Sequence, residues 1–97
     1  MTGYFAVSKA GHDKDTCYVI VGEEGDMVYL CDGRLKTMSS PKKKKKKHIQ
    51  LIKRSVSADL LRRLCHTGED GVRNVQDEEI KYELKQYLRE KKEKKVE

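Results

Sequence analysis

The sequence GYFAVSKAGHDKDTCYVIV, at residues 3–21, decides the fold that we expect for this chain. Its first part alternates imperfectly, with Phe5 and Val7 on one side, as a short β-strand does. Its last part, TCYVIVG at residues 16–22, is rich in β-branched and aromatic residues, which strands favour. The segment AGHDKD between the two is polar and contains a glycine, a composition typical of loops. The stretch therefore predicts two strands joined by a loop.

Three features extend this β pattern along the chain. The apolar run MVYLC at residues 27–31 predicts a third strand, reached through a tight turn in which Gly25 can take a positive φ. The dipeptide Asp32-Gly33 is a strong turn signal. HIQLI at residues 48–52 then predicts a fourth short strand. Several short strands separated by turns indicate a small all-β barrel or sandwich in this half of the chain.

The pattern changes to that of helices in the second half of the chain. Ser57 is a suitable N-cap for a first helix, and Gly68 is a signal for its end, with a loop to follow. A second helix is expected to begin near Gln76 and to fray beyond Leu88, where no apolar stripe remains. The expected apolar stripes are Leu60, Leu61, Leu64 and Cys65 in the first helix and Ile80, Leu84, Tyr87 and Leu88 in the second.

The net charge of +6 is distributed very unevenly. Residues 1–33 hold two Lys/Arg and six Asp/Glu, residues 55–97 hold ten of each, and residues 34–54 hold ten Lys/Arg without any acid. Positive charge concentrated in this way attracts polyanions, and a membrane surface is the competing target. The run of six lysines at residues 42–47, which we expect in a loop, is its centre. A solvated run without a ligand and a nuclear-localisation signal are the alternative interpretations of that run.

Length and cysteine usage exclude several classes of protein. The 97 residues suffice for one small domain with an appendage, and neither a signal peptide nor the roughly 18 apolar residues of a membrane span are recognisable. Cys17, Cys31 and Cys65 are an odd number without a C-x-x-C pair, which favours reduced thiols and argues against a zinc site. No nucleophile elbow, phosphate-binding loop or carboxylate pair indicates catalysis. We therefore expect a soluble cytoplasmic protein with no metal, no cofactor and no enzymatic activity.

The first half of the chain resembles a known family. GYFAVSKAGHDKDTCYVIV, followed by MVYLCDGRL at residues 27–35, resembles the KOW motif, a strand-loop-strand element of SH3-like barrels in large-subunit ribosomal proteins and NusG-type elongation factors. Gly11 falls at the glycine that defines the motif. The continuation DGRLKTMSSPKKKKKKHIQL, at residues 32–51, is similar to a bacterial group of KOW proteins. That group resembles an archaeal and eukaryotic large-subunit ribosomal protein family and is described as RNA-binding. The resemblance covers roughly residues 1–54.

The resemblance implies an SH3-like barrel that contacts RNA through the loop around Gly11. Carried over position by position, it gives Lys9, Gly11, His12 and Lys14 as RNA contacts. A glycine there relieves backbone strain and also lets the backbone come close to a phosphate. Two features depart from the family. The run of six lysines is more monotonous than a typical family loop, which suggests that it acts through charge, and the helical half matches no pattern of the family.

We therefore expect an α+β chain, in which a KOW SH3-like barrel at residues 1–55 is followed by two helices with a charged tail at residues 56–97. The expected function is RNA binding, as a ribosome-associated or ribosomal-type component of translation that contacts ribosomal RNA of the large subunit. The alternative is a protein-interaction module, in which the barrel or the C-terminal helix contacts a transcription or translation factor and RNA binding is incidental. The location of the charge favours RNA, because a protein-binding barrel has no need of ten uncompensated cations. The expected RNA contacts are Lys9, Gly11, His12, Lys14, Arg34, Lys36, Lys42, Lys43, Lys44, Lys45, Lys46, Lys47, His48, Lys53 and Arg54.

Overall fold

The computed structural model describes residues 1–12, 14–65 and 75–94, with the side chains of these up to Glu90. Within these residues the chain forms five strands, one short 3-10 helix and two α-helices. They are β1 (Tyr4–Ser8), β2 (Cys17–Glu24), β3 (Met27–Cys31), β4 (Lys42–Lys45), the 3-10 helix η1 (Lys46–His48), β5 (Ile49–Ser55), α1 (Ala58–Cys65) and α2 (Asp77–Lys94). The chain therefore belongs to the α+β class that its sequence predicts. The predicted helix end at Gly68 and the loop after it lie outside the described residues.

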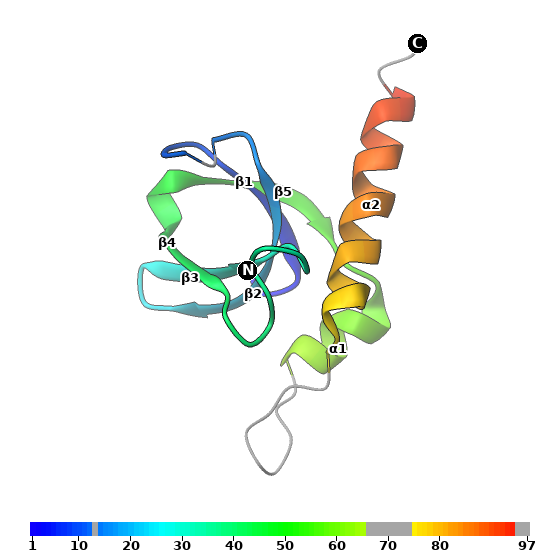
Figure 1. Cartoon of the computed structure of the whole chain (residues 1–97), viewed down its shortest axis with the longest axis horizontal. Coiled ribbons are helices and arrows are strands. Elements are labelled where there is room, and N and C mark those ends of the chain that lie inside the picture. The colour runs from blue at the N-terminus through cyan, green and yellow to red at the C-terminus, as the bar shows by residue number, and fades with distance from the viewer. Residues whose placement is uncertain (13, 66–74, 95–97) are drawn as a thin grey trace.

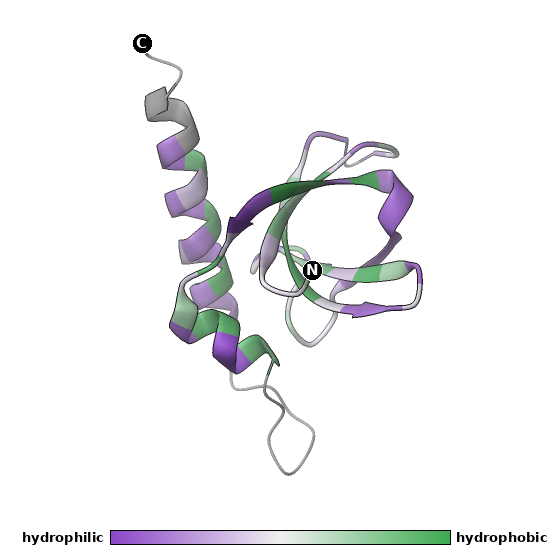
Figure 2. Ribbon diagram, turned by 180° about the vertical axis from the view of Figure 1, so that it is seen from behind, coloured by the Kyte–Doolittle hydropathy of each residue, from purple (hydrophilic) through white to green (hydrophobic). Residues whose placement is uncertain are grey.

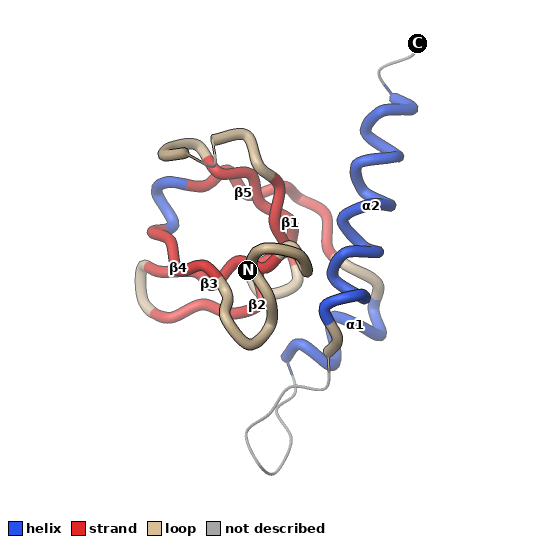
Figure 3. Tube along the Cα trace, in the orientation of Figure 1, coloured by secondary structure: helices blue, strands red, loops and turns tan. Residues whose placement is uncertain are grey.

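The five strands form one antiparallel sheet in the order β4-β3-β2-β1-β5. Strand β5 returns to pair with β1, so that Ile49 lies opposite Ser8 and Ser55 lies opposite Tyr4. The sheet is strongly curved, with bulges in the β1–β5 and β2–β3 pairs, which increase local twist (Figure 1). The sheet is not closed, because β4 and β5 are its edges. Figure 3 shows η1 as the short helical segment that links these two edges.

Alternate residues of the strands fill two hydrophobic clusters, one on each face of the sheet. The inner cluster lies inside the curve and consists of Ala6, Tyr18, Ile20, Val28, Leu30 and Ile49. The outer cluster includes Phe5, Val19, Val21 and Cys31 of the sheet with Leu60, Leu64, Ile80 and Leu84 of the helices. Successive side chains of a strand point to opposite faces, so β2 supplies both clusters. Figure 2 shows the hydrophobic colour along much of the curved sheet, whereas the segment of β4 and η1 is hydrophilic.

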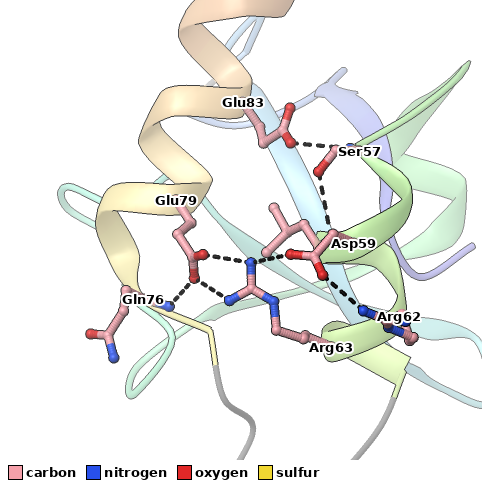
Figure 4. A network of polar contacts seen from close by, with 8 residues as sticks. Ser57, Asp59, Arg62, Arg63, Gln76, Glu79 and Glu83 are labelled. Carbon is pink, nitrogen blue, oxygen red and sulfur yellow. Dashed lines mark hydrogen bonds and ion pairs between the residues drawn. The ribbon is translucent and has the colours of Figure 1, made fainter.

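Polar contacts hold the two helices together (Figure 4). Arg63 of α1 pairs with Glu79 of α2 at 2.6 Å and with Asp59 of its own helix at 3.0 Å. Glu83 of α2 accepts a hydrogen bond of 3.0 Å from the amide of Ser57, the residue before α1. The hydrogen bond from Arg63 holds the pKa of Glu79 below its ordinary value. The helices therefore dock on each other as well as on the sheet.

Several sequence predictions are confirmed. The strand at residues 27–31 is β3. The strand predicted at residues 48–52 is β5, which runs from Ile49 to Ser55 and leaves His48 in η1. Gly25 and Gly33 both have positive φ, as turn glycines do. Ser57 caps α1, because its hydroxyl oxygen lies 3.5 Å from the amide of Leu60.

The prediction that the lysine run forms a loop is wrong. Lys42–Lys45 is the edge strand β4, and the end of the run, Lys46 and Lys47, belongs to η1. The backbone of β4 pairs with β3 from Met27 to Leu30, and this pairing needs no apolar side chain. Lysine is also a residue that edge strands commonly carry.

The prediction that α2 frays beyond Leu88 is also wrong, because the helix continues to Lys94. The residues after Leu88 are arginine, glutamate and lysine, which are good helix formers even without an apolar stripe. An ion pair between Glu90 and Arg54 of β5 fastens this part of the helix to the sheet. No helix among the described residues combines the length and the apolar character that a membrane span needs.

Gly33 should be more sensitive to substitution than Gly25. A Cβ at Gly33, where φ is +78°, would lie 2.4 Å from the carbonyl oxygen of Asp77, whereas a Cβ at Gly25, where φ is +59°, would meet nothing within 4 Å. Gly25→Ala should lower the free energy of unfolding by about 1 kcal/mol through backbone strain alone. Gly33→Ala should lower it by about 3 kcal/mol, because the clash with α2 adds to the strain. Urea unfolding measures both, and equal losses would contradict a tight contact at Gly33.

The Arg63–Glu79 pair should make stability depend on pH. The pKa of Glu79 is lower in the folded than in the unfolded chain, so the pair stabilises the fold above the unfolded pKa. This contribution is lost as the pH falls through the folded pKa. Glu79→Gln should lower the free energy of unfolding at neutral pH by less than about 1 kcal/mol, because both side chains are about one-third exposed. In urea unfolding the deficit should shrink at about pH 3, and an equal deficit at both pH values would assign the effect to packing.

Candidate nucleic-acid interface

The loop between β1 and β2, residues 9–16, is closed at its base by backbone hydrogen bonds. The amide of Ser8 donates to the carbonyl oxygen of Thr16 at 3.0 Å, and the carbonyl oxygen of Ser8 accepts the amide of Asp15 at 2.8 Å. Gly11 has a φ of +87°, a backbone conformation that side-chain-bearing residues rarely adopt. The conformational role that the sequence predicts for Gly11 is therefore confirmed. Asp15 also has a positive φ, of 72°, which no sequence signal indicates.

This loop lies against the segment that connects the two edges of the sheet (Figure 1). The amide of Lys9 donates to the carbonyl oxygen of His48 at 2.9 Å, and Nζ of Lys44 donates to the carbonyl oxygen of Ala10 at 2.8 Å. The Gly11 loop and the lysine run, which are distant in the sequence, therefore lie side by side. We call the exposed Lys9, His12, Lys14, Lys45 and Lys47, with the half-buried His48, the basic corner.

The remaining lysines of the run make contacts within the protein. Lys46 forms a 2.8 Å ion pair with Glu23 of β2. Lys43 is exposed, with its Nζ 5.8 Å from the centre of a tyrosine ring of β3. Lys42 and Lys44 are half-buried. The run is therefore not a uniform row of solvated charges.

Lys53 and Arg54 lie at the end of β5 that is farthest from the Gly11 loop. Lys53 is exposed, whereas Arg54 forms an ion pair with Glu90 and lies 5.7 Å from the centre of the Tyr87 ring. Residues 34–54 contain no acid, but the fold brings acids from other segments against them. The positive charge of this segment is thus partly compensated in space.

Arg34 and Lys36 belong to the turn after β3, where Oδ1 of Asp32 accepts their amides at 2.8 and 2.9 Å. Arg34 also lines a groove of about 670 Å³ between this turn, the end of the Gly11 loop and α2. The groove has acids as well as bases in its wall, so it is not simply a continuation of the basic corner. Its charged residues are Asp15, Asp32, Arg34, Lys81 and Lys85, and its apolar ones include Leu84 and Leu88.

The apolar stripe of α2 is used mainly inside the protein. Ile80 and Leu84 are buried in the outer cluster, and Leu88 is 49% exposed. A protein partner that docked on this stripe would therefore reach Leu88 but not Ile80 or Leu84. The burial of Ile80 and Leu84 therefore gives little support to the alternative that α2 is a docking surface for a protein partner.

The described residues contain no group of three or more His, Cys, Asp or Glu placed to hold a metal ion. Burial raises the pKa of Cys31 to about 11, so its thiol stays protonated at neutral pH. Neither a protein-family model nor a curated protein matches the chain.

Gly11→Val should damage the loop that forms half of the basic corner. A β-branched residue tolerates a φ of +87° poorly, so the melting temperature should fall by about 5 °C or more. Gly11→Asn should be milder, because asparagine visits the left-handed region more readily. Thermal unfolding followed by circular dichroism compares the two variants. Unchanged melting of the valine variant would contradict the conformational role of Gly11.

Proposed function

We propose that this protein binds structured RNA through the basic corner, without catalytic activity of its own. The observation that carries the proposal is the meeting of the Gly11 loop and the lysine run in one corner of the sheet. Hydrogen bonds from Lys9 to His48 and from Lys44 to Ala10 join the two segments. A glycine loop that lets backbone approach a phosphate, next to exposed lysines, is a combination suited to a polyanion.

We also propose that the curved sheet is an SH3-like barrel of the KOW type. Support comes from the arrangement of the strands, in which β1 to β4 pair in sequence order and β5 returns to β1. The 3-10 helix η1 joins β4 to β5 across the open side of the curve. The Gly11 loop occupies the β1–β2 connection, which is the place that the resemblance to the KOW motif implies.

The chemistry of the corner favours contact with phosphates over contact with bases. Proteins that hold unstacked bases use exposed aromatic rings as stacking platforms. None of the aromatic side chains described in this structure belongs to the basic corner. Tyr18 is buried, the Tyr29 hydroxyl donates to Glu24 at 2.7 Å, and the exposed Tyr4 and Tyr82 lie at the other end of β1 and on α2. Lysines contact a folded RNA through its backbone and shape. The target that we propose is therefore helical RNA, in particular ribosomal RNA of the large subunit, with the protein as a cytoplasmic, ribosome-associated component.

A salt titration with two RNAs tests the proposal. If the four lysines of the basic corner each neutralise one phosphate of an RNA hairpin, log K against log salt should have a slope of about −3 to −4. A single-stranded RNA of the same length should bind more weakly, because the corner offers it no stacking platform. Lys47→Gln should make the slope shallower by about one unit. Lys53→Gln, at the far end of β5, is the matched control and should leave the slope unchanged.

Two outcomes would contradict the proposal. A slope near about −1 would mean that the lysines are bystanders. Tighter binding of the single strand would mean that bases rather than the RNA backbone are recognised. The ribosomal assignment has its own test, because the protein should sediment with large ribosomal subunits in low salt and leave them in high salt.

A further inference from the structure

We propose that the lysine run consists of two sets with different tasks, separated by the pleat of β4 at Lys42–Lys45 and by the contacts and exposure of Lys46 and Lys47 in η1. Lys42, Lys44 and Lys46 hold the fold and the Gly11 loop in place. Lys45 and Lys47 of the basic corner, together with Lys43 on the same face of β4, face the solvent and contact RNA phosphates. Lys44 is the central positioning residue of the first set. The RNA-contacting half of this inference rests on the proposed function, while the positioning half does not.

The pairing of β4 with β3 decides which side chains share a face. Residues directly opposite each other in an antiparallel pair point to the same side of the sheet. Lys44 lies opposite Val28 and Lys42 lies opposite Leu30, and both of these partners belong to the inner cluster. Lys43 lies opposite Tyr29, which packs against the outer cluster. Alternate lysines are accordingly half-buried and exposed along the strand.

Lys44 crosses the inside of the curve to reach the base of the Gly11 loop. Its Nζ donates to the hydroxyl oxygen of Ser8 and, at 2.8 Å, to the carbonyl oxygen of Ala10. The Ser8 hydroxyl in turn donates to the same carbonyl oxygen at 3.1 Å, and Ser8 is completely buried. A partly buried ammonium group is costly unless acceptors surround it, and hydrogen bonds from a charged donor are stronger than neutral ones. Lys44 therefore fixes Ala10, the residue immediately before Gly11.

Lys46 fastens the other end of the same segment. Its Nζ pairs with Glu23 at 2.8 Å, and its amide donates to the carbonyl oxygen of Asp26 at 2.8 Å. The hydrogen bond from Lys46 lowers the pKa of Glu23, and the N-terminal amine contributes as well. The positive charge of Lys46 is thus offset by an acid of the β2–β3 hairpin. This pairing holds η1, and with it His48, beside the loop.

The other set faces the solvent. Lys43, Lys45 and Lys47 are all exposed, and Nζ of Lys43 lies 5.8 Å from the centre of the Tyr29 ring. Side chains two residues apart on one face of a strand are separated by roughly 6.6 Å. Lys43 and Lys45 therefore present two charges in a row on one face of β4, and Lys47 continues the set into η1. These three are the lysines of the run that an RNA backbone can reach without disturbing the fold.

A pair of charge-matched variants separates the two sets. The outward variant carries Lys43→Gln, Lys45→Gln and Lys47→Gln, and the inward variant carries Lys42→Gln, Lys44→Gln and Lys46→Gln. Each removes three positive charges, so the two have the same net charge and the same composition. The outward variant should keep its melting temperature within about 2 °C, while its salt slope with an RNA hairpin becomes shallower by about two to three units. The inward variant should melt about 5 °C or more lower, and its folded fraction should keep a slope within about one unit of the parent.

Single substitutions keep the inference testable if the inward variant fails to fold. Lys44→Met keeps the length of the stem and removes the ammonium group, and Lys45→Met makes the same change on the exposed side. Amide hydrogen exchange of Lys9 and Asp15, whose amides are bonded at the base of the loop, should accelerate about tenfold or more in the first variant and stay unchanged in the second.

The outcomes distinguish this inference from the proposed function. If the parent protein binds no RNA, the proposed function fails, while melting and hydrogen exchange still decide the positioning role of Lys44. Equal melting temperatures and equal losses of salt slope in the two charge-matched variants would overturn the division of the run. Unchanged exchange in Lys44→Met would overturn the assignment of Lys44 as the residue that positions the Gly11 loop.

Discussion

Burial of both faces of the sheet is the constraint on which the rest of the structure depends. The five strands are short, and the inner cluster that their curvature encloses holds only six buried residues. A core of that size is a weak basis for a folded domain, so the outer face must be covered too. The two helices cover it, and the rings of Phe5 in β1 and Tyr87 in α2 stack with their centres 4.7 Å apart. With both faces used for stability, the edges, loops and corners of the sheet are what is left for a ligand. The basic corner lies where the β1–β2 loop meets the connection between the two edges.

The β-strands and turns could be predicted where the side chains carry the signal. The MVYLC strand, the turn glycines and the cap at Ser57 follow from apolar composition and from backbone conformations that few residues adopt. Strand β4 could not be predicted in this way, because lysine has no strand preference and the strand forms through backbone pairing with β3. The last part of α2 was not predicted for a similar reason, because a helix can continue through good helix formers without an apolar stripe. Both errors fall on lysine-rich segments, where hydrophobic periodicity carries no information.

The segments of the candidate site could be identified from the sequence, but the arrangement of their side chains could not. The sequence indicated that the Gly11 loop and the lysine run act together, and the structure places them side by side. A count of charges along the chain could not show that Glu23 would pair with Lys46, or that Glu90 would pair with Arg54. Nor could it show that Lys44 would turn inward to Ser8, because that requires the register of β4 against β3. The number of positive residues in a segment is thus an upper limit on the positive charge that this segment can present to a ligand.

The monotony of the lysine run has a physical explanation in the two sides of β4. The inward positions need a long side chain with several donors at its end, since Lys44 must reach across the curve to Ser8 and Ala10. The outward positions suit cations, because charged lysines on an edge strand discourage pairing with the edge of another molecule. The proposed function adds a second reason, because phosphates attract cations. One residue type therefore satisfies requirements that arise independently on opposite faces. A run of identical residues in a sequence need not mean identical surroundings, and along β4 the alternation of the strand separates half-buried from exposed lysines.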